Sequence, residues 1–262
     1  MPTSLIESLG QLAEDAGRLI MKHYEQGVKG EIKSDGSPVT VADREAEALI
    51  TAGLHHLTPS WPVIGEEAAS VGALPNIHGQ RYWLVDPLDG TREFLTRSDD
   101  FAVSIGLIDN ERPILGVVCA PATNDLWTGD LTGRTPRATH RSPGKETHKI
   151  TVRPARIKGL TVVTSRNHNN ESALERYLSG LKVKERCLRG SALKFGLIAL
   201  GEADLYPRFG TTREWDTAGG QAILTAAGGK VVTAEGWPLR YGKPNFSNPS
   251  FIACGGSASH ER

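Results

Sequence analysis

The chain has 262 residues, of which 39% are hydrophobic and 23% are charged, and its 30 Lys and Arg balance its 30 Asp and Glu. These proportions exclude a mainly disordered chain, and the zero net charge argues against a general binder of nucleic acid polymers or membranes. Because no apolar run reaches the roughly 18 residues of a membrane span and the N-terminus lacks a secretory pattern, we expect a cytoplasmic protein without an integral membrane segment, with peripheral inner-membrane association left open.

The first 150 residues predict two helices followed by a sheet. Apolar residues at three- and four-residue spacing predict an amphipathic helix over 5–20, and a second helix that starts near Asp43 and runs to 57. From its position alone, Asp43 is interpreted as a helix cap or first-turn acid. Strands are predicted over 82–85, 101–108 and 114–119. The polar stretch 132–149 is predicted to be a surface excursion or hinge.

The second half of the chain alternates strands and helices. Strands are predicted over 160–164, 203–206 and 230–233, and helices over 172–181, 191–200 and 215–227. We therefore expect an α/β fold with two lobes and a boundary near residue 150. An N-terminal α+β lobe over 1–150 would carry the larger sheet, and a smaller α/β lobe would span 151–262.

The segment 86–91, Asp-Pro-Leu-Asp-Gly-Thr, ends an apolar strand with two carboxylates. Asp86 and Asp89 can face one point together with the Leu88 carbonyl, and hard oxygen ligands of this kind suit magnesium. A single aspartate after a strand is more often a turn former. Glu66 and Asp216 supply carboxylates at two further predicted strand or helix ends, and several such ends are what a site for more than one magnesium ion requires.

The strings 65–67, 86–91 and 215–220, in this order and spacing, resemble the signature of the inositol monophosphatase superfamily over nearly the whole chain. The strings at 37–40, 91–94, 165–168, 190–195 and 206–209 most resemble its 3'(2'),5'-bisphosphate nucleotidase branch. The resemblance implies an α+β layered sandwich of the sugar-phosphatase type. It also implies a lithium-sensitive phosphatase of sulfate assimilation. Gly219 stands where that family usually has Ala, which should loosen its helix slightly.

The resemblance further implies two to three magnesium ions, held by acidic side chains and one carbonyl: Glu66, Asp86, the Leu88 carbonyl, Asp89 and Asp216. A third, weaker ion would lean on Glu66. Thr91 and Asp43 would orient the attacking water, so the catalytic residues would be Asp43, Glu66 and Thr91. This role replaces the cap interpretation of Asp43. The ions would activate a water molecule for in-line attack, with no covalent intermediate.

The resemblance implies a small nucleotide bisphosphate as the substrate. The implied substrate-binding residues are Asp89, Gly90, Thr91, His168, Ser191, Lys194, Arg208 and Asp216. Inositol monophosphatases carry a Glu at the position of Arg208, whereas an Arg accepts no hydrogen bonds and is suited to a second phosphate. We therefore expect hydrolysis of the 3'-phosphate of adenosine 3',5'-bisphosphate to AMP and phosphate, with its sulfated form as a further candidate.

Three alternatives to this function differ from it in what they require of the sequence. An aspartyl-phosphate mechanism of the haloacid dehalogenase type needs two aspartates two residues apart, whereas Asp86 and Asp89 are three apart with a proline between them. An inositol or sugar phosphatase is the main alternative. A non-catalytic magnesium- or nucleotide-binding regulator is the other, and it would be expected to lack a ligand or the water-orienting pair. The oligomeric state stays open.

Overall fold

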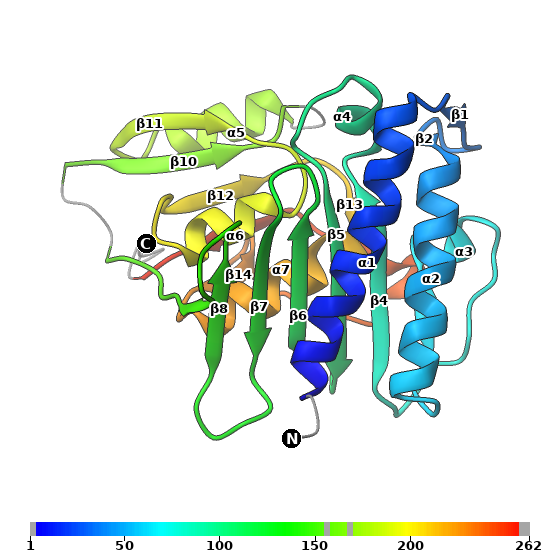
Figure 1. Cartoon of the computed structure of the whole chain (residues 1–262). Coiled ribbons are helices and arrows are strands. Elements are labelled where there is room, and N and C mark those ends of the chain that lie inside the picture. The colour runs from blue at the N-terminus through cyan, green and yellow to red at the C-terminus, as the bar shows by residue number, and fades with distance from the viewer. Residues whose placement is uncertain (1–3, 155–157, 167–169, 257–262) are drawn as a thin grey trace.

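The computed structural model describes residues 4–154, 158–166 and 170–256, which form alternating layers of helices and sheets (Figure 1). The larger sheet has seven strands in the order in which they follow along the chain; β3 and β4 are parallel and all other neighbours are antiparallel. These strands are β3 (Val63–Gly65), β4 (Tyr82–Asp89), β5 (Ala102–Asp109), β6 (Arg112–Ala120), β7 (Asp125–Asp130), β8 (Arg137–Arg141) and β9 (His148–Lys149).

Two long helices, α1 (Leu5–Gln26) and α2 (Val41–Leu57), cover one face of this sheet. Side chains alternate along each strand, so Trp83 and Val85 of β4 pack toward these helices, while Leu84 packs toward the opposite face. On that opposite face lie α6 (Leu193–Ala199) and α7 (Trp215–Ala226), both from the second half of the chain.

The second sheet has five strands in the order β11-β10-β12-β16-β14. They are β10 (Leu160–Thr164), β11 (Val183–Leu188), β12 (Leu205–Arg208), β14 (Lys230–Thr233) and β16 (Phe251–Cys254). Helices α6 and α7 pack between the two sheets, and α5 (Glu171–Leu178) packs on the outer face of the second sheet. The mixed α/β fold expected from the sequence is confirmed, whereas the division into two lobes near residue 150 stays a prediction.

Short elements complete the chain and surround the site described below. Two ribbons pair β1 (Glu31–Ile32) with β2 (Pro38–Val39), and β13 (Thr212–Arg213) with β15 (Ser247–Asn248). The remaining short elements are the helices α3 (Glu66–Ser70) and α4 (Thr91–Leu95) and the 3₁₀ helix η1 (Pro244–Phe246).

Helix α7 approaches the larger sheet so closely that glycine is required on both sides. Gly106, Gly116 and Gly129 of the sheet face its backbone and small side chains. A Cβ added at Gly219 would lie 2.8 Å from the Ser104 Oγ and 2.9 Å from the Val117 carbonyl oxygen. Gly219 therefore allows the helix to approach the sheet closely, a role that outweighs its low helix propensity.

The prediction for residues 132–149 was wrong in part, because this polar stretch contains β8 and β9 of the larger sheet. Most of the stretch is exposed, but two of its polar side chains are buried with partners: the Thr139 and Thr128 hydroxyls are 2.7 Å apart, and the His140 Nε2 lies 2.8 Å from the Asp125 Oδ1. Paired polar groups can occupy a strand without the apolar pattern used to predict one.

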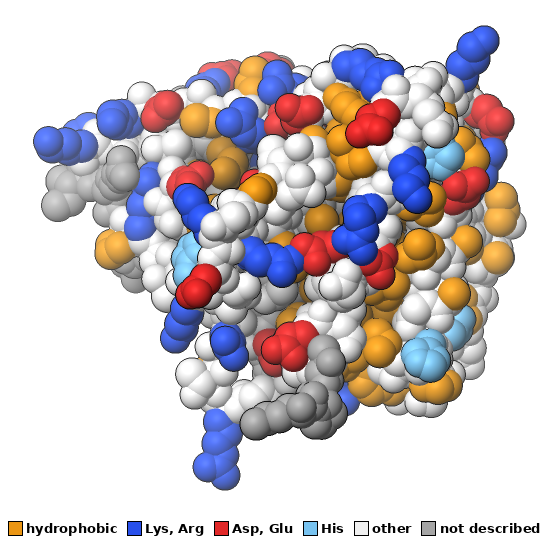
Figure 2. Space-filling model, in the orientation of Figure 1, with side chains coloured by type: hydrophobic (Ala, Val, Ile, Leu, Met, Phe, Trp, Pro, Cys, Tyr) orange, Lys and Arg blue, Asp and Glu red, His pale blue; other side chains and the backbone are white. Residues whose placement is uncertain are grey.

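The surface agrees with the neutral composition. On the face shown in Figure 2, acidic and basic side chains are interspersed. Among the described residues, no helix combines the length and apolar character that a bilayer crossing requires.

Candidate active site

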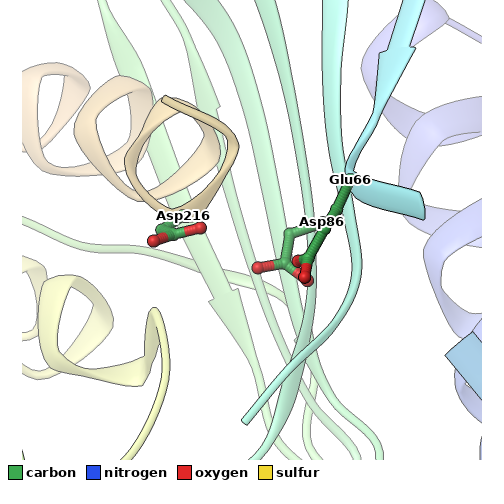
Figure 3. Close-up of side chains that lie close together, drawn as sticks. All are labelled: Glu66, Asp86 and Asp216. Carbon is green, nitrogen blue, oxygen red and sulfur yellow. The ribbon is translucent and has the colours of Figure 1, made fainter. Parts of the chain in front are cut away.

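Three carboxylates from three separate elements meet at one edge of the larger sheet. Glu66 begins α3, Asp86 lies in β4, and Asp216 lies in the first turn of α7. Each offers an oxygen, and these oxygens lie within 4.8 Å of one another. Figure 3 shows the Glu66 and Asp86 carboxylates side by side, with Asp216 facing them from its helix.

The pairing of β3 with β4 explains why Glu66 and Asp86 meet. The strands are parallel and Gly65 pairs with Val85, so the next residue of each strand comes out at the same edge. The pairing of β4 with β5 is irregular between Asp86 and Asp89, where Pro87 has no backbone N–H to donate. Between these two aspartates β4 has one residue more than the facing segment of β5, and this bulge allows both aspartates to line the same cleft.

Burial makes the carboxylates of this site hold their protons more tightly than usual. Burial, and then the neighbouring carboxylates, raise the pKa values of Asp86 and Asp216 well above their usual range. Burial also raises the pKa of Asp89 to about 6, although the nearby Lys194 opposes the shift. Grouped anions with raised pKa values are stabilised by a cation, and an all-oxygen set of this kind fits a hard divalent ion.

Beside the acidic cluster, Thr91 joins Asp43 through a hydrogen bond. The Thr91 Oγ1 donates to the Asp43 Oδ1 at 2.9 Å. The other oxygen of Asp43 accepts from the Thr40 backbone N–H at 2.8 Å and from the Thr40 hydroxyl at 2.7 Å, which completes a capping box at the start of α2. Asp43 is therefore both the helix-capping acid and the partner of Thr91, so the two sequence interpretations do not compete.

Lys33, which was not predicted from the sequence, contacts the acidic cluster from the β1–β2 ribbon. Its Nζ donates to the Glu66 Oε1 at 2.7 Å and to the Glu67 Oε1 at 2.6 Å. Burial lowers the pKa of Lys33, but the two carboxylates outweigh this effect and raise it. No local pattern marks Lys33, because the fold of the ribbon alone brings it to the cluster.

Glu47 was also missed, and it supports the position of Glu66. The Glu47 carboxylate accepts hydrogen bonds from the backbone N–H groups of Glu67 at 2.7 Å and Ala68 at 2.8 Å, at the start of α3. It fills the space beside Gly65, where an added Cβ would lie 2.3 Å from the Glu47 Cδ. Its sequence signal was a second acid, besides Asp43, on the inner face of a helix whose other inner residues are apolar.

A cleft of about 410 Å³ joins the acidic cluster to a basic wall. Lys194 and Arg208 are both buried and line this wall together with Ser191. The Lys194 Nζ donates to the Ser191 carbonyl oxygen at 2.5 Å and lies 5.0 Å from the centre of the Tyr206 ring. Burial lowers the pKa of Lys194 to about 8; Asp89 opposes this shift and Arg208 adds to it. Two buried cations so close together are suited to a polyvalent anion.

The cleft brings together most of the residues singled out from the sequence. Those that line it are Glu66, Asp86, Leu88, Asp89, Gly90, Thr91, Ser191, Lys194, Arg208 and Asp216. Asp43 reaches it through Thr91. His168 lies outside the described residues. Arg166 also lines the cleft, although the sequence marked it only as part of the string 165–168.

Known proteins resemble the chain along nearly its whole length. The inositol monophosphatase family matches residues 1–261. A 3'(2'),5'-bisphosphate nucleotidase CysQ of Escherichia coli (strain K12) is 44% identical over 254 residues, which cover 94% of this chain and 98% of that protein. The protein of the same name from Buchnera aphidicola is 40% identical over 257 residues, which cover 95% and 93% of the two chains.

Among solved structures, CysQ from Bacteroides thetaiotaomicron, described as a bacterial member of the inositol monophosphatase family, has a TM-score of 0.80 and 34% identity, and the match covers 97% of this chain and 98% of that one. An inositol monophosphatase from Zymomonas mobilis has a TM-score of 0.76 and 27% identity, with 96% and 92% of the two chains covered. On this sequence and structural similarity, the chain belongs to the inositol monophosphatase family.

Proposed function

We propose that this protein is a magnesium-dependent 3'(2'),5'-bisphosphate nucleotidase, which hydrolyses the 3'-phosphate of adenosine 3',5'-bisphosphate to AMP and phosphate. One observation carries the proposal: a single cleft holds an acidic cluster on one side and the buried pair Lys194 and Arg208 on the other. The relatives that are 40–44% identical bear the same enzyme name.

In this proposal the acidic cluster holds two to three magnesium ions. Glu66, Asp86 and the Leu88 carbonyl would hold the first, and Asp86, Asp89 and Asp216 the second, while a third would lean on Glu66. When bound, the ions supply positive charge that neutralises the phosphoryl oxygens and acidifies a water molecule. The raised pKa values of Asp86 and Asp216 support this assignment. They reflect burial and then the repulsion between the ionised carboxylates, and a bound cation would offset this repulsion.

Thr91 and Asp43 would orient the attacking water. The Thr91 hydroxyl donates its hydrogen to Asp43, so its oxygen lone pairs can accept a hydrogen bond from water. Burial raises the pKa of Asp43, which makes its carboxylate a better proton acceptor. Thr40 fixes the second Asp43 oxygen, so the pair is held in place before substrate binds.

Lys194 and Arg208 would bind the phosphate that is not hydrolysed. A buried Arg offers only donors, which suits phosphate oxygens and does not suit the hydroxyl hydrogens of an inositol ring. Ser191 would add a hydroxyl at the same wall. We further propose a cytoplasmic location, because the three described cysteines are free thiols, as is usual in a reducing compartment.

The test is phosphate release, with magnesium, from adenosine 3',5'-bisphosphate, its 5'-phosphosulfate counterpart, inositol 1-phosphate and fructose 1,6-bisphosphate. We expect the highest kcat/KM for a nucleotide substrate. A higher value for inositol 1-phosphate or fructose 1,6-bisphosphate would instead identify a sugar phosphatase. If no phosphate is released from any of them, although the folded protein binds nucleotide, the regulator alternative is correct.

A further inference from the structure

Asp100 lies outside the acidic cluster, yet it joins two walls of the cleft. It follows α4 and precedes β5, and its carboxylate is 14% exposed. One oxygen, Oδ2, accepts from the Arg166 Nε at 3.0 Å, from the Arg166 Nη2 at 2.9 Å and from the Gly190 backbone N–H at 3.1 Å. Both partners belong to the second half of the chain, and both line the cleft.

The Gly190 contact anchors the turn that carries Ser191 and positions Lys194. Gly190 approaches so closely that an added Cβ would lie 2.3 Å from the Asp100 carbonyl oxygen. Ser191 has a left-handed backbone with φ of 50°, which is strained for a residue with a side chain. The Lys194 Nζ donates hydrogen bonds to two carbonyl oxygens of this turn, that of Arg189 at 3.3 Å and that of Ser191 at 2.5 Å. Asp100 therefore holds in place the turn to which the Lys194 ammonium is hydrogen-bonded.

The Arg166 contact places a further cation at the cleft. Arg166 follows β10, and its side chain is 44% exposed. The guanidinium of an Arg has five N–H donors. In Arg166, the Nε–H and one N–H of Nη2 are used by Asp100. The remaining donors can serve an anion in the cleft, and the pairing with Asp100 restricts the rotamers of a long side chain before that anion binds.

We propose that Asp100 is a positioning residue for the phosphate that is not hydrolysed, acting through Arg166 and through the turn at Gly190 and Ser191. The inference rests on the proposed function and adds to it a residue that touches neither the scissile phosphate nor the acidic cluster. If this ion pair only stabilised the contact between the two halves of the chain, its removal would lower the hydrolysis of all substrates equally. A positioning residue affects the substrate with the second phosphate more.

The experiment compares adenosine 3',5'-bisphosphate with adenosine 3'-monophosphate, which differs only by the second phosphate. In Asp100→Asn, the ratio of kcat/KM for the bisphosphate to that for the monophosphate should fall about tenfold, mainly through KM, as expected for loss of charge-assisted hydrogen bonds. The matched control is Asp99→Asn, because Asp99 is exposed and hydrogen-bonds to Tyr24 instead. It should leave the ratio unchanged.

A second variant keeps the test decisive if Asp100→Asn fails to fold. Arg166→Gln changes a more exposed side chain and should lower the same ratio, and the double variant should lose less than the product of the two single losses. If the wild type prefers the bisphosphate but both variants keep its ratio, the inference is wrong and the proposed function stands. If the wild type shows no such preference, both fall together.

Discussion

Replacement of Arg208 by Glu is the sharpest test of which substrate the cleft binds. Arg208 is 7% exposed and shares its wall with Lys194, which is 3% exposed, so solvent screens their charges poorly. Loss of one partner of a buried charged pair costs about 2 to 5 kcal/mol. The substitution also introduces an anion that repels the bound phosphate. We therefore expect kcat/KM for adenosine 3',5'-bisphosphate to fall by about 30- to 4,000-fold.

The assay measures kcat/KM for adenosine 3',5'-bisphosphate and for adenosine 3'-monophosphate in the wild type and the variant. The monophosphate should be affected far less, because it lacks the group that Arg208 is proposed to bind. Arg208→Gln removes the charge without adding a new one, and Arg137→Gln removes a charge from the exposed surface of β8 as a control. If Arg208→Glu lowers both substrates equally, Arg208 is structural or serves the reacting phosphate, and the bisphosphate assignment loses its main physical support.

Three further predictions concern the metal cluster and the helix that completes it. Asp216→Asn should keep the fold but lose more activity than the roughly 10- to 100-fold typical of residues that only support a metal ligand; near-normal turnover at saturating magnesium would contradict the ligand assignment. In the metal-free protein, burial raises the pKa of Asp89 to about 6. A carboxyl whose folded-state pKa is raised stabilises the protein fully below its unfolded pKa, and this stability is lost as the pH rises through the folded pKa. Without metal, Tm should therefore fall between about pH 4 and 6, whereas with magnesium it should hold. A Tm without metal that is flat across this range would refute this reasoning. Gly219→Ala should destabilise the protein by about 1 kcal/mol, because a clash costing about 1 to 3 kcal/mol outweighs a helix-propensity gain of about 1 kcal/mol. Thermal denaturation measures this loss, with Gly133→Ala as the control, because the nearest atom to a Cβ added at Gly133 would be 3.8 Å away. A Gly219→Ala variant that is more stable than the wild type would show instead that the helix can shift to accept the methyl group.

The elements with clear periodicity could be predicted from the sequence. The strands over 160–164 and 230–233 were predicted with the bounds that the structure gives, because an isolated apolar run between polar segments has one reasonable interpretation. The first helix continues to Gln26, beyond its apolar pattern, and ends at Gly27 in the left-handed conformation. The strand over 137–141 could not be predicted, because paired polar groups replace the apolar alternation there.

The acidic residues of the site could be predicted because each follows a recognisable local event, namely the end of a strand or the start of a helix. Lys33, Glu47 and Asp100 could not, because their importance depends on contacts with residues that are 20 to 90 positions away. Such residues carry no local pattern of their own. A charged residue in a turn or in the middle of a helix is usually on the surface, and only the tertiary fold distinguishes these three.

Helix α7 shows how the fold and the site depend on each other. Asp216 belongs to the second half of the chain, but its carboxylate must reach the ends of β3 and β4 in the first half. The helix can approach only because the sheet offers glycines beneath it and because Gly219 of the helix has no side chain. Displacement of α7 away from the sheet would therefore carry Asp216 away from Glu66 and Asp86. Small residues far from any ligand thus set the separation of the carboxylates, and the packing of α7 is part of the proposed metal site.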